Sequence, residues 1–129
     1  KKPETFDFLG FTFYCGKGKR SRNFCVKLKT NRKKFQQKLK ATKEWLYENR
    51  TMPVKEMISK LNLKLIGHYK YYGVSHNSAK IGAFLHFIQR YLYKVLNRRS
   101  HKRSYTWDGY IEMLKVYPLA KPKIYVKLF

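Results

Sequence analysis

Acidic residues are scarce in this sequence. Its 129 residues include 7 Asp and Glu against 30 Lys and Arg, which gives a formal net charge of +23. That excess is far beyond what solubility requires, and it indicates a polyanionic partner. Nucleic acid is the leading candidate, because each neutralised phosphate releases a condensed counterion, and an anionic membrane surface is the second. The few carboxylates also argue against metal-dependent nucleotidyl transfer or hydrolysis, which needs two or three converging acids.

Cysteine and long apolar runs are scarce too. Cys15 and Cys25 are too few for a disulfide scaffold, and their spacing matches no common zinc site. We expect buried or half-buried free thiols and no metal, although pairing of the two stays open. No apolar run approaches the roughly 18 residues of a spanning helix, and no signal segment opens the chain. We therefore expect an intracellular, soluble protein that is not secreted and has no membrane partner.

Aromatic residues, by contrast, make up 17% of the chain, with 11 Tyr and 9 Phe. Most of them fill a core, but the excess of Tyr favours surfaces where a ring stacks and its hydroxyl stays hydrated. Bases and riboses offer such surfaces. Basic charge with interleaved Tyr therefore suits RNA better than lipid headgroups, which favour Trp and Leu on one helix face.

The first part of the chain has the pattern of a β-hairpin. Residues 6–28 alternate between apolar and polar side chains around a glycine-rich basic tip at residues 16–23. The tip lacks the further glycine or the Gly-Lys-Ser/Thr sequence of a phosphate-cradling loop. We expect a hairpin unit at residues 1–29 and a helical domain at residues 30–129.

The rest of the chain is predicted to be mainly α. Apolar residues recur at helical spacing over about 31–49, 54–72 and 78–99, which predicts a three-helix bundle. A short helix is expected over residues 107–116. Two prolines then force an extended tail, whose residues 124–129 alternate like a strand. The expected N-caps are Thr30 or Asn31, Asn77 or Ser78, and Thr106.

Two neighbouring residues in the second helix are unusual. Gly67 costs about 1 kcal/mol relative to Ala inside a helix. It indicates that a neighbouring helix or a nucleic-acid backbone approaches the main chain there. His68 lies near the apolar side, and we expect a buried histidine with its hydrogen bonds satisfied rather than a catalytic base.

Three segments together resemble the group II intron reverse transcriptases. The Phe-Leu-Gly-Phe sequence at residues 8–11 resembles the block where palm passes into thumb. Residues 61–72, Leu-Asn-Leu-Lys-Leu-Ile-Gly-His-Tyr-Lys-Tyr-Tyr, resemble the maturase-specific segment, with His68 in place of the usual Trp. The basic stretch 98–103, followed by Tyr-x-Trp at 105–107, resembles the end of that family's next helix.

The resemblance implies a thumb, also called the X or maturase domain, which grips the primer-template duplex and helps to hold the intron RNA. The parent protein would be an RNA-directed DNA polymerase acting in RNA splicing and retrohoming, with palm and fingers on the same chain. The family's catalytic Tyr-x-Asp-Asp motif, with its Mg²⁺, belongs to the palm. We therefore expect no catalytic residue and no cofactor in this fragment.

A thumb must track an A-form duplex without reading its sequence, which contacts to phosphates and 2′-hydroxyls allow. Lysine-rich helix faces with Arg and Tyr can provide those contacts. We predict that the nucleic-acid-binding residues are Lys34, Lys38, Lys70, Tyr71, Arg90, Tyr93, Lys94, Arg98, Arg99, Lys102 and Arg103.

The residues leave other functions open. The thumb of a CRISPR-associated or other non-intron reverse transcriptase would have the same pattern. A nuclease or recombinase piece is disfavoured by the acid count. A basic interaction module would instead bind ribosomal RNA or an anionic membrane.

Reversing Arg90 and Lys94 to Glu should weaken binding of duplex RNA by several kcal/mol, because each charge-assisted phosphate contact contributes about 1.5–3 kcal/mol. Binding isotherms of parent and double variant at one salt concentration measure the loss. Undiminished binding by the variant would show that this face of the third helix does not meet the RNA.

Overall fold

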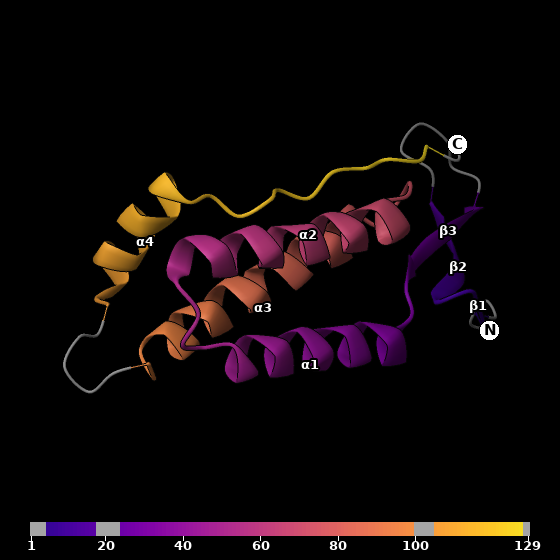
Figure 1. The fold of residues 1–129 in the computed structure, drawn as a ribbon. Helices are drawn as coiled ribbons and strands as arrows, with labels where there is room; N and C mark the ends of the chain where they lie inside the picture. The colour runs from indigo at the N-terminus through magenta and orange to yellow at the C-terminus, as the bar shows by residue number, and fades with distance from the viewer. Residues whose placement is uncertain (1–4, 18–23, 100–104, 128–129) are drawn as a thin grey trace.

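The computed structural model describes residues 5–17, 24–99 and 105–127, in which three strands precede four helices (Figure 1). The predicted class, mainly α with N-terminal β structure, is confirmed. β1 (Phe6–Phe8), β2 (Phe11–Lys17) and β3 (Phe24–Thr30) form an antiparallel sheet in that order. The expected hairpin is β2 and β3, and β1 adds a third strand. Most of the expected basic tip, residues 18–23, lies outside the described residues.

The turn between β1 and β2 is fixed to the helices. Its central residues Leu9 and Gly10 have φ values of 53° and 84°, as a two-residue type I′ hairpin turn requires. The Leu9 carbonyl accepts a hydrogen bond of 2.7 Å from the Tyr71 hydroxyl, and the Gly10 carbonyl accepts one of 2.8 Å from the Asn31 amide. A Cβ on Gly10 would lie 2.9 Å from the Tyr72 hydroxyl oxygen. The glycine therefore serves both the turn and the close approach.

The helices are α1 (Arg32–Glu48), α2 (Val54–Tyr72), α3 (Ser78–Leu96) and α4 (Trp107–Val116). In Figure 1, α1, α2 and α3 lie side by side, and α4 stands at the end of the bundle remote from the sheet. α1 packs on α3, and so does α2, whereas α1 and α2 contact each other less. The core is drawn mainly from the predicted apolar stripes of these helices. α3 ends at Leu96 rather than near residue 99.

Two of the expected caps are confirmed. The Asn31 side chain accepts a hydrogen bond from the Lys34 amide at 3.1 Å, and Thr106 accepts one from the Gly109 amide at 3.0 Å. Asn77 precedes α3 but makes no capping hydrogen bond.

Asn77 instead joins three elements through its side-chain amide. Its oxygen accepts from the Thr30 amide at 2.8 Å, and its NH₂ group donates to the Thr30 hydroxyl and to the Tyr72 carbonyl, each at 2.8 Å. The side chain is fully buried. The end of β3, the end of α2 and the start of α3 are thus held at one point.

The tail after α4 is extended, as expected, and the structure describes residues 124–127 of its strand-like part. Only one isolated parallel bridge forms there, between Val74 and Val126. The tail runs back along α2 toward the sheet (Figure 1). Its hydrogen-bond partners among the described residues lie on α2 and on the segment that follows α2, rather than in the sheet.

Polar groups of α2 hold this tail. The Asn62 amide donates to the Pro118 carbonyl at 3.0 Å and accepts from the Ala120 amide at 2.8 Å. The Tyr69 hydroxyl donates to the Ala120 carbonyl at 2.9 Å. Just beyond α2, the Gly73 carbonyl accepts from the amides of residues 125 and 126.

Two further observations concern the surface. Cys15 is an exposed free thiol, so the expectation of a buried or half-buried thiol is wrong for it, and the Cys25 side chain lies outside the described part. In the described ranges, none of the helices is both long and apolar enough to cross a bilayer. Whether residues 1–29 and 30–129 are separate domains stays a prediction.

Replacing Asn77 by Ala should destabilise the fold by about 2–4 kcal/mol, because the buried amide and hydroxyl of Thr30 lose their Asn77 partner, whereas the Tyr72 carbonyl keeps the Val74 amide. Urea unfolding followed by circular dichroism measures the change. Asn31→Ala is the matched control, since removing an exposed cap should cost only about 1 kcal/mol. Equal losses in the two variants would contradict the role given to Asn77.

Candidate nucleic-acid interface

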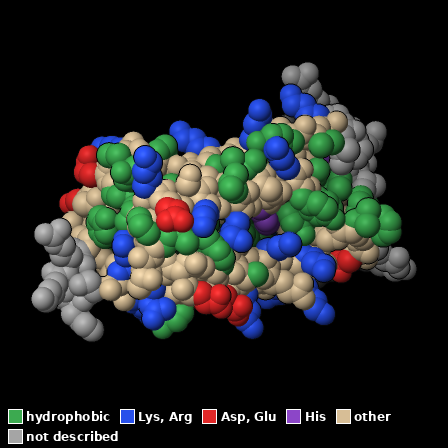
Figure 2. Space-filling view, in the orientation of Figure 1, with side chains coloured by type: hydrophobic (Ala, Val, Ile, Leu, Met, Phe, Trp, Pro, Cys, Tyr) green, Lys and Arg blue, Asp and Glu red, His purple; other side chains and the backbone are tan. Residues whose placement is uncertain are grey.

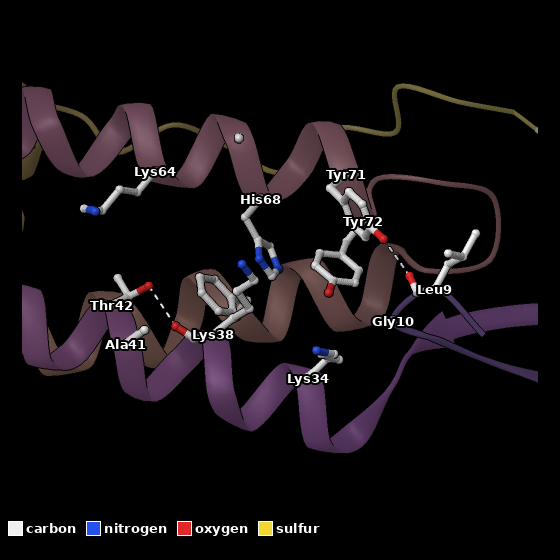
Figure 3. A pocket seen from close by; sticks show the side chains of 12 residues that line it. Leu9, Gly10, Lys34, Lys38, Ala41, Thr42, Lys64, His68, Tyr71 and Tyr72 are labelled. Carbon is white, nitrogen blue, oxygen red and sulfur yellow. Dashed lines mark hydrogen bonds between the residues drawn. The ribbon is translucent and has the colours of Figure 1, made fainter. Parts of the chain in front are cut away.

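A surface hollow of about 760 Å³ lies where α1 and α2 diverge above α3. Lys34, Lys38 and Thr42 of α1 and Lys64 and His68 of α2 provide its polar lining. Figure 3 shows these side chains on the two facing helices. The remaining lining residues are Leu9, Gly10, Ala41, Gly67, Tyr71, Tyr72 and Phe84. We call this site the α1–α2 hollow.

Two helical stripes build the α1–α2 hollow. Residues 34, 38, 41 and 42 recur at the i, i+4, i+7 spacing of one face of α1, and residues 64, 67, 68 and 71 do so on α2. Lys34, Lys38 and Tyr71 were predicted from the sequence, whereas Lys64 and the lining role of His68 were not. The spacing of Lys64 to His68, one turn apart on α2, is the signal that could have found them.

No carboxylate lies among the described residues that line the α1–α2 hollow. Two other surface hollows differ, since one is lined by Asp7 and another by Glu44 and Glu48. Elsewhere, Glu56 and Glu112 form ion pairs with lysines of their own helices. Figure 2, in the orientation of Figure 1, shows blue Lys and Arg side chains around a purple histidine. The α1–α2 hollow therefore presents positive charge that no acid of its own lining offsets.

The residues that were predicted on α3 fall into two groups. Arg90 and Lys94, one turn apart, are exposed, as is His86. Tyr93 and Asn97 are half-buried against the segment that leads into α4. The Tyr93 hydroxyl donates to the Tyr105 carbonyl at 3.1 Å, and its ring centroid lies 5.0 Å from that of Trp107. Tyr93 thus has a packing role that the sequence did not indicate.

The other predicted residues do not join the hollow. Lys70 is exposed on α2 outside its lining, and Arg98 and Arg99 follow the end of α3. Lys102 and Arg103 lie outside the described residues. The structure thus brings Lys34, Lys38 and Tyr71 together, and it places Arg90 and Lys94 in a separate row. Binding of nucleic acid by any of them stays a prediction.

His68 is buried, as expected, but its hydrogen bonds are not satisfied. Only 8% of the residue is exposed, and its Nε2 atom has no hydrogen-bond partner among the described residues. Its ring stacks on Phe84 with centroids 3.8 Å apart. Burial, and secondarily the positive charge of Lys38, lower the pKa of His68 to about 4. His68 is therefore neutral at pH 7.

The described residues contain no group of three His, Cys, Asp or Glu side chains that could hold a metal ion. The charge that acts on the pKa of His68 is that of Lys38, and no carboxylate of the kind that orients a catalytic histidine lines the hollow among the described residues. Positive charge, exposed rings and one buried neutral imidazole are the chemistry that this surface offers. Such groups bind anions and stack on planar ligands.

The lowered pKa of His68 makes the stability of the fold depend on pH. In the unfolded chain, His68 binds a proton near pH 6.5. In the folded chain, where Lys38, Tyr72 and Phe84 surround it, His68 binds that proton only near pH 4. The free energy of unfolding should therefore fall as the pH drops from 6.5 to 4, by up to about 3 kcal/mol at about 1.36 kcal/mol per pKa unit.

Urea titrations at pH 7 and pH 4.5 would measure this loss. His68→Phe keeps a ring on Phe84 without a titratable group, so it should lose less stability over the same interval. The same loss in the parent and the variant would show that other groups cause it.

Comparison with protein families gives a match. The family model for the group II intron maturase-specific domain matches residues 32–110, which run from the start of α1 into α4. Comparisons with curated proteins and with solved structures find no match. The matched region contains most of the bundle and the two stripes of the α1–α2 hollow, and it makes up more than half of the chain. The chain belongs to the group II intron maturase-specific domain family.

Proposed function

We propose that this chain is the RNA-binding thumb of a group II intron-type reverse transcriptase. It would grip the primer-template duplex and the intron RNA through its basic helical surfaces. The observation that carries the proposal is the α1–α2 hollow, which Lys34, Lys38 and Lys64 line without a carboxylate. Membership of the maturase-specific family points to intron RNA as the polyanion.

The charges fit a backbone-tracking role. Lys34 and Lys38 are exposed, and so are Arg90 and Lys94 on α3. Lysine and arginine at such positions neutralise phosphates without reading bases, as a surface that meets every template must do. A-form duplexes are bound mostly in this way, by shape and by backbone contacts.

The proposal assigns chemistry to other parts of the parent protein. That parent would be an RNA-directed DNA polymerase acting in splicing and retrohoming, in the bacterial cytoplasm or in an organelle. Mg²⁺ would belong to its palm, and the palm and fingers would be partners of this thumb. The family match favours intron RNA over ribosomal RNA and over the target of a CRISPR-associated enzyme.

The proposed contact predicts a local charge effect on α1. Lys34→Glu with Lys38→Glu should weaken duplex RNA binding and reduce the slope of log K against log salt by about 2, since each lost phosphate contact removes about 0.9. Fluorescence anisotropy with a labelled RNA duplex at several salt concentrations measures both quantities.

The matched control reverses two lysines on another side of the same helix. Lys33 and Lys40 line a different hollow that also contains Asp7. Lys33→Glu with Lys40→Glu changes the net charge equally, yet should reduce the slope far less. If both pairs reduce it equally, only net charge matters and the assigned face is wrong.

A further inference from the structure

Building on the proposed RNA-binding function, we propose that the α1–α2 hollow holds one unpaired nucleotide of the bound RNA. Its base would lie against Tyr71 and the edge of His68. Its phosphates would lie among Lys34, Lys38 and Lys64. The bundle would then recognise a bulged or splayed-out nucleotide in addition to the backbone of a duplex.

His68 provides the first observation. A buried polar atom without a partner is rare in folded proteins, and it commonly marks the place of a ligand or water. Figure 3 shows His68 directed from α2 into the hollow, with Lys38 reaching toward it from α1. The Nε2 atom of the neutral imidazole can donate or accept one hydrogen bond, depending on the tautomer, with a base edge or a ribose hydroxyl as its partner. A phosphate that draws the exposed Lys38 side chain outward would uncover Nε2.

The rings beside His68 provide the second observation. Its centroid lies 4.8 Å from that of Tyr72, and Tyr72 lies 4.6 Å from Tyr71. Tyr71 is 52% exposed, yet it stacks on Phe11 at 5.9 Å and its hydroxyl is bound to Leu9. An exposed ring held in one orientation is a stacking platform, and unpaired bases are commonly bound on such platforms.

Gly67 provides the third observation. A Cβ at this position would meet nothing within 4 Å, so the expectation that a neighbouring helix approaches it is wrong. The glycine nevertheless lines the hollow and leaves the α2 main chain open to it. The space fits a ribose-phosphate unit passing close to the helix.

The size of the hollow limits the ligand. Sites for small molecules occupy about 300–1,000 Å³, and the 760 Å³ of the hollow falls in that range. A duplex cannot enter such a space, but one nucleotide can. A bare phosphate would use the lysines and leave the ring platform and the imidazole without a role.

The test compares three labelled RNAs of equal length: a fully paired duplex, the same duplex with one bulged nucleotide, and that duplex with an abasic bulge. The 129-residue chain should bind the bulged RNA about fivefold or more tightly than the paired one, the gain expected from stacking one base. The abasic bulge should give no such gain.

Two variants test the site. His68→Gln should reduce the bulged-to-paired affinity ratio toward one. Gly67→Leu should do the same by filling the hollow, and its Cβ meets no neighbour that would disturb the fold. Gly82→Leu is the matched control, because Gly82 lies on α3 outside the hollow and its Cβ position is equally open. It should keep the full ratio.

The outcomes separate this inference from the proposed function. Equal binding of paired and bulged RNA overturns the nucleotide site and leaves duplex binding intact. Equal gain from the abasic bulge, or a ratio that Gly67→Leu leaves unchanged, also overturns it. Failure to bind any of the three RNAs overturns the proposed function together with the site.

Discussion

One buried amide determines how the sheet and the bundle meet. Asn77 forms hydrogen bonds with the last amide of β3, the hydroxyl of Thr30 and a carbonyl at the end of α2. The segment of α2 that it fixes carries Tyr71 and Tyr72, which in turn contact the Leu9–Gly10 turn. The position of the turn, and with it one end of the α1–α2 hollow, therefore depends on a side chain that contributes nothing to the apolar core.

The shape of the hollow follows from how α1 and α2 pack on α3, and its charge follows from where the few acidic residues lie. Because α1 and α2 rest on α3 more than on each other, their facing stripes stay apart and their lysines stay hydrated. Glu44, Glu56 and Glu112 pair with lysines within one turn of their own helices, where such exposed pairs contribute little to stability. These acidic residues thus neutralise lysines of their own helices, and the positive charge of the two facing stripes remains uncompensated.

Local patterns in the sequence predicted the local structure. The periodicity gave the four helices to within a few residues, and Asn31 and Thr106 were correctly expected as caps because capping depends on neighbours three residues away. What the sequence did not predict were contacts between residues far apart in the chain. Asn77 bonds a residue 47 positions away, and the tail binds α2 across more than 50 positions, so no window of sequence contains either interaction. The same limit applies to the candidate site. Helical spacing placed Lys34 and Lys38 on one face, but only the fold shows that His68 and Lys64 face them across a hollow.

The way in which the tail is held has a consequence for how its sequence can vary. α2 contributes the side chains of Asn62 and Tyr69, whereas the tail contributes only backbone groups to those hydrogen bonds. Gly73 is constrained as well, because a Cβ there would collide with the backbone carbonyls of Tyr69 and Lys123. The exposed positions 121 and 123 of such a strap can therefore vary freely, whereas Leu119 and Ala120 also pack against the core. A change at position 62, 69 or 73 would remove or distort contacts that hold the strap, so intolerance to substitution is concentrated on the α2 side of this contact.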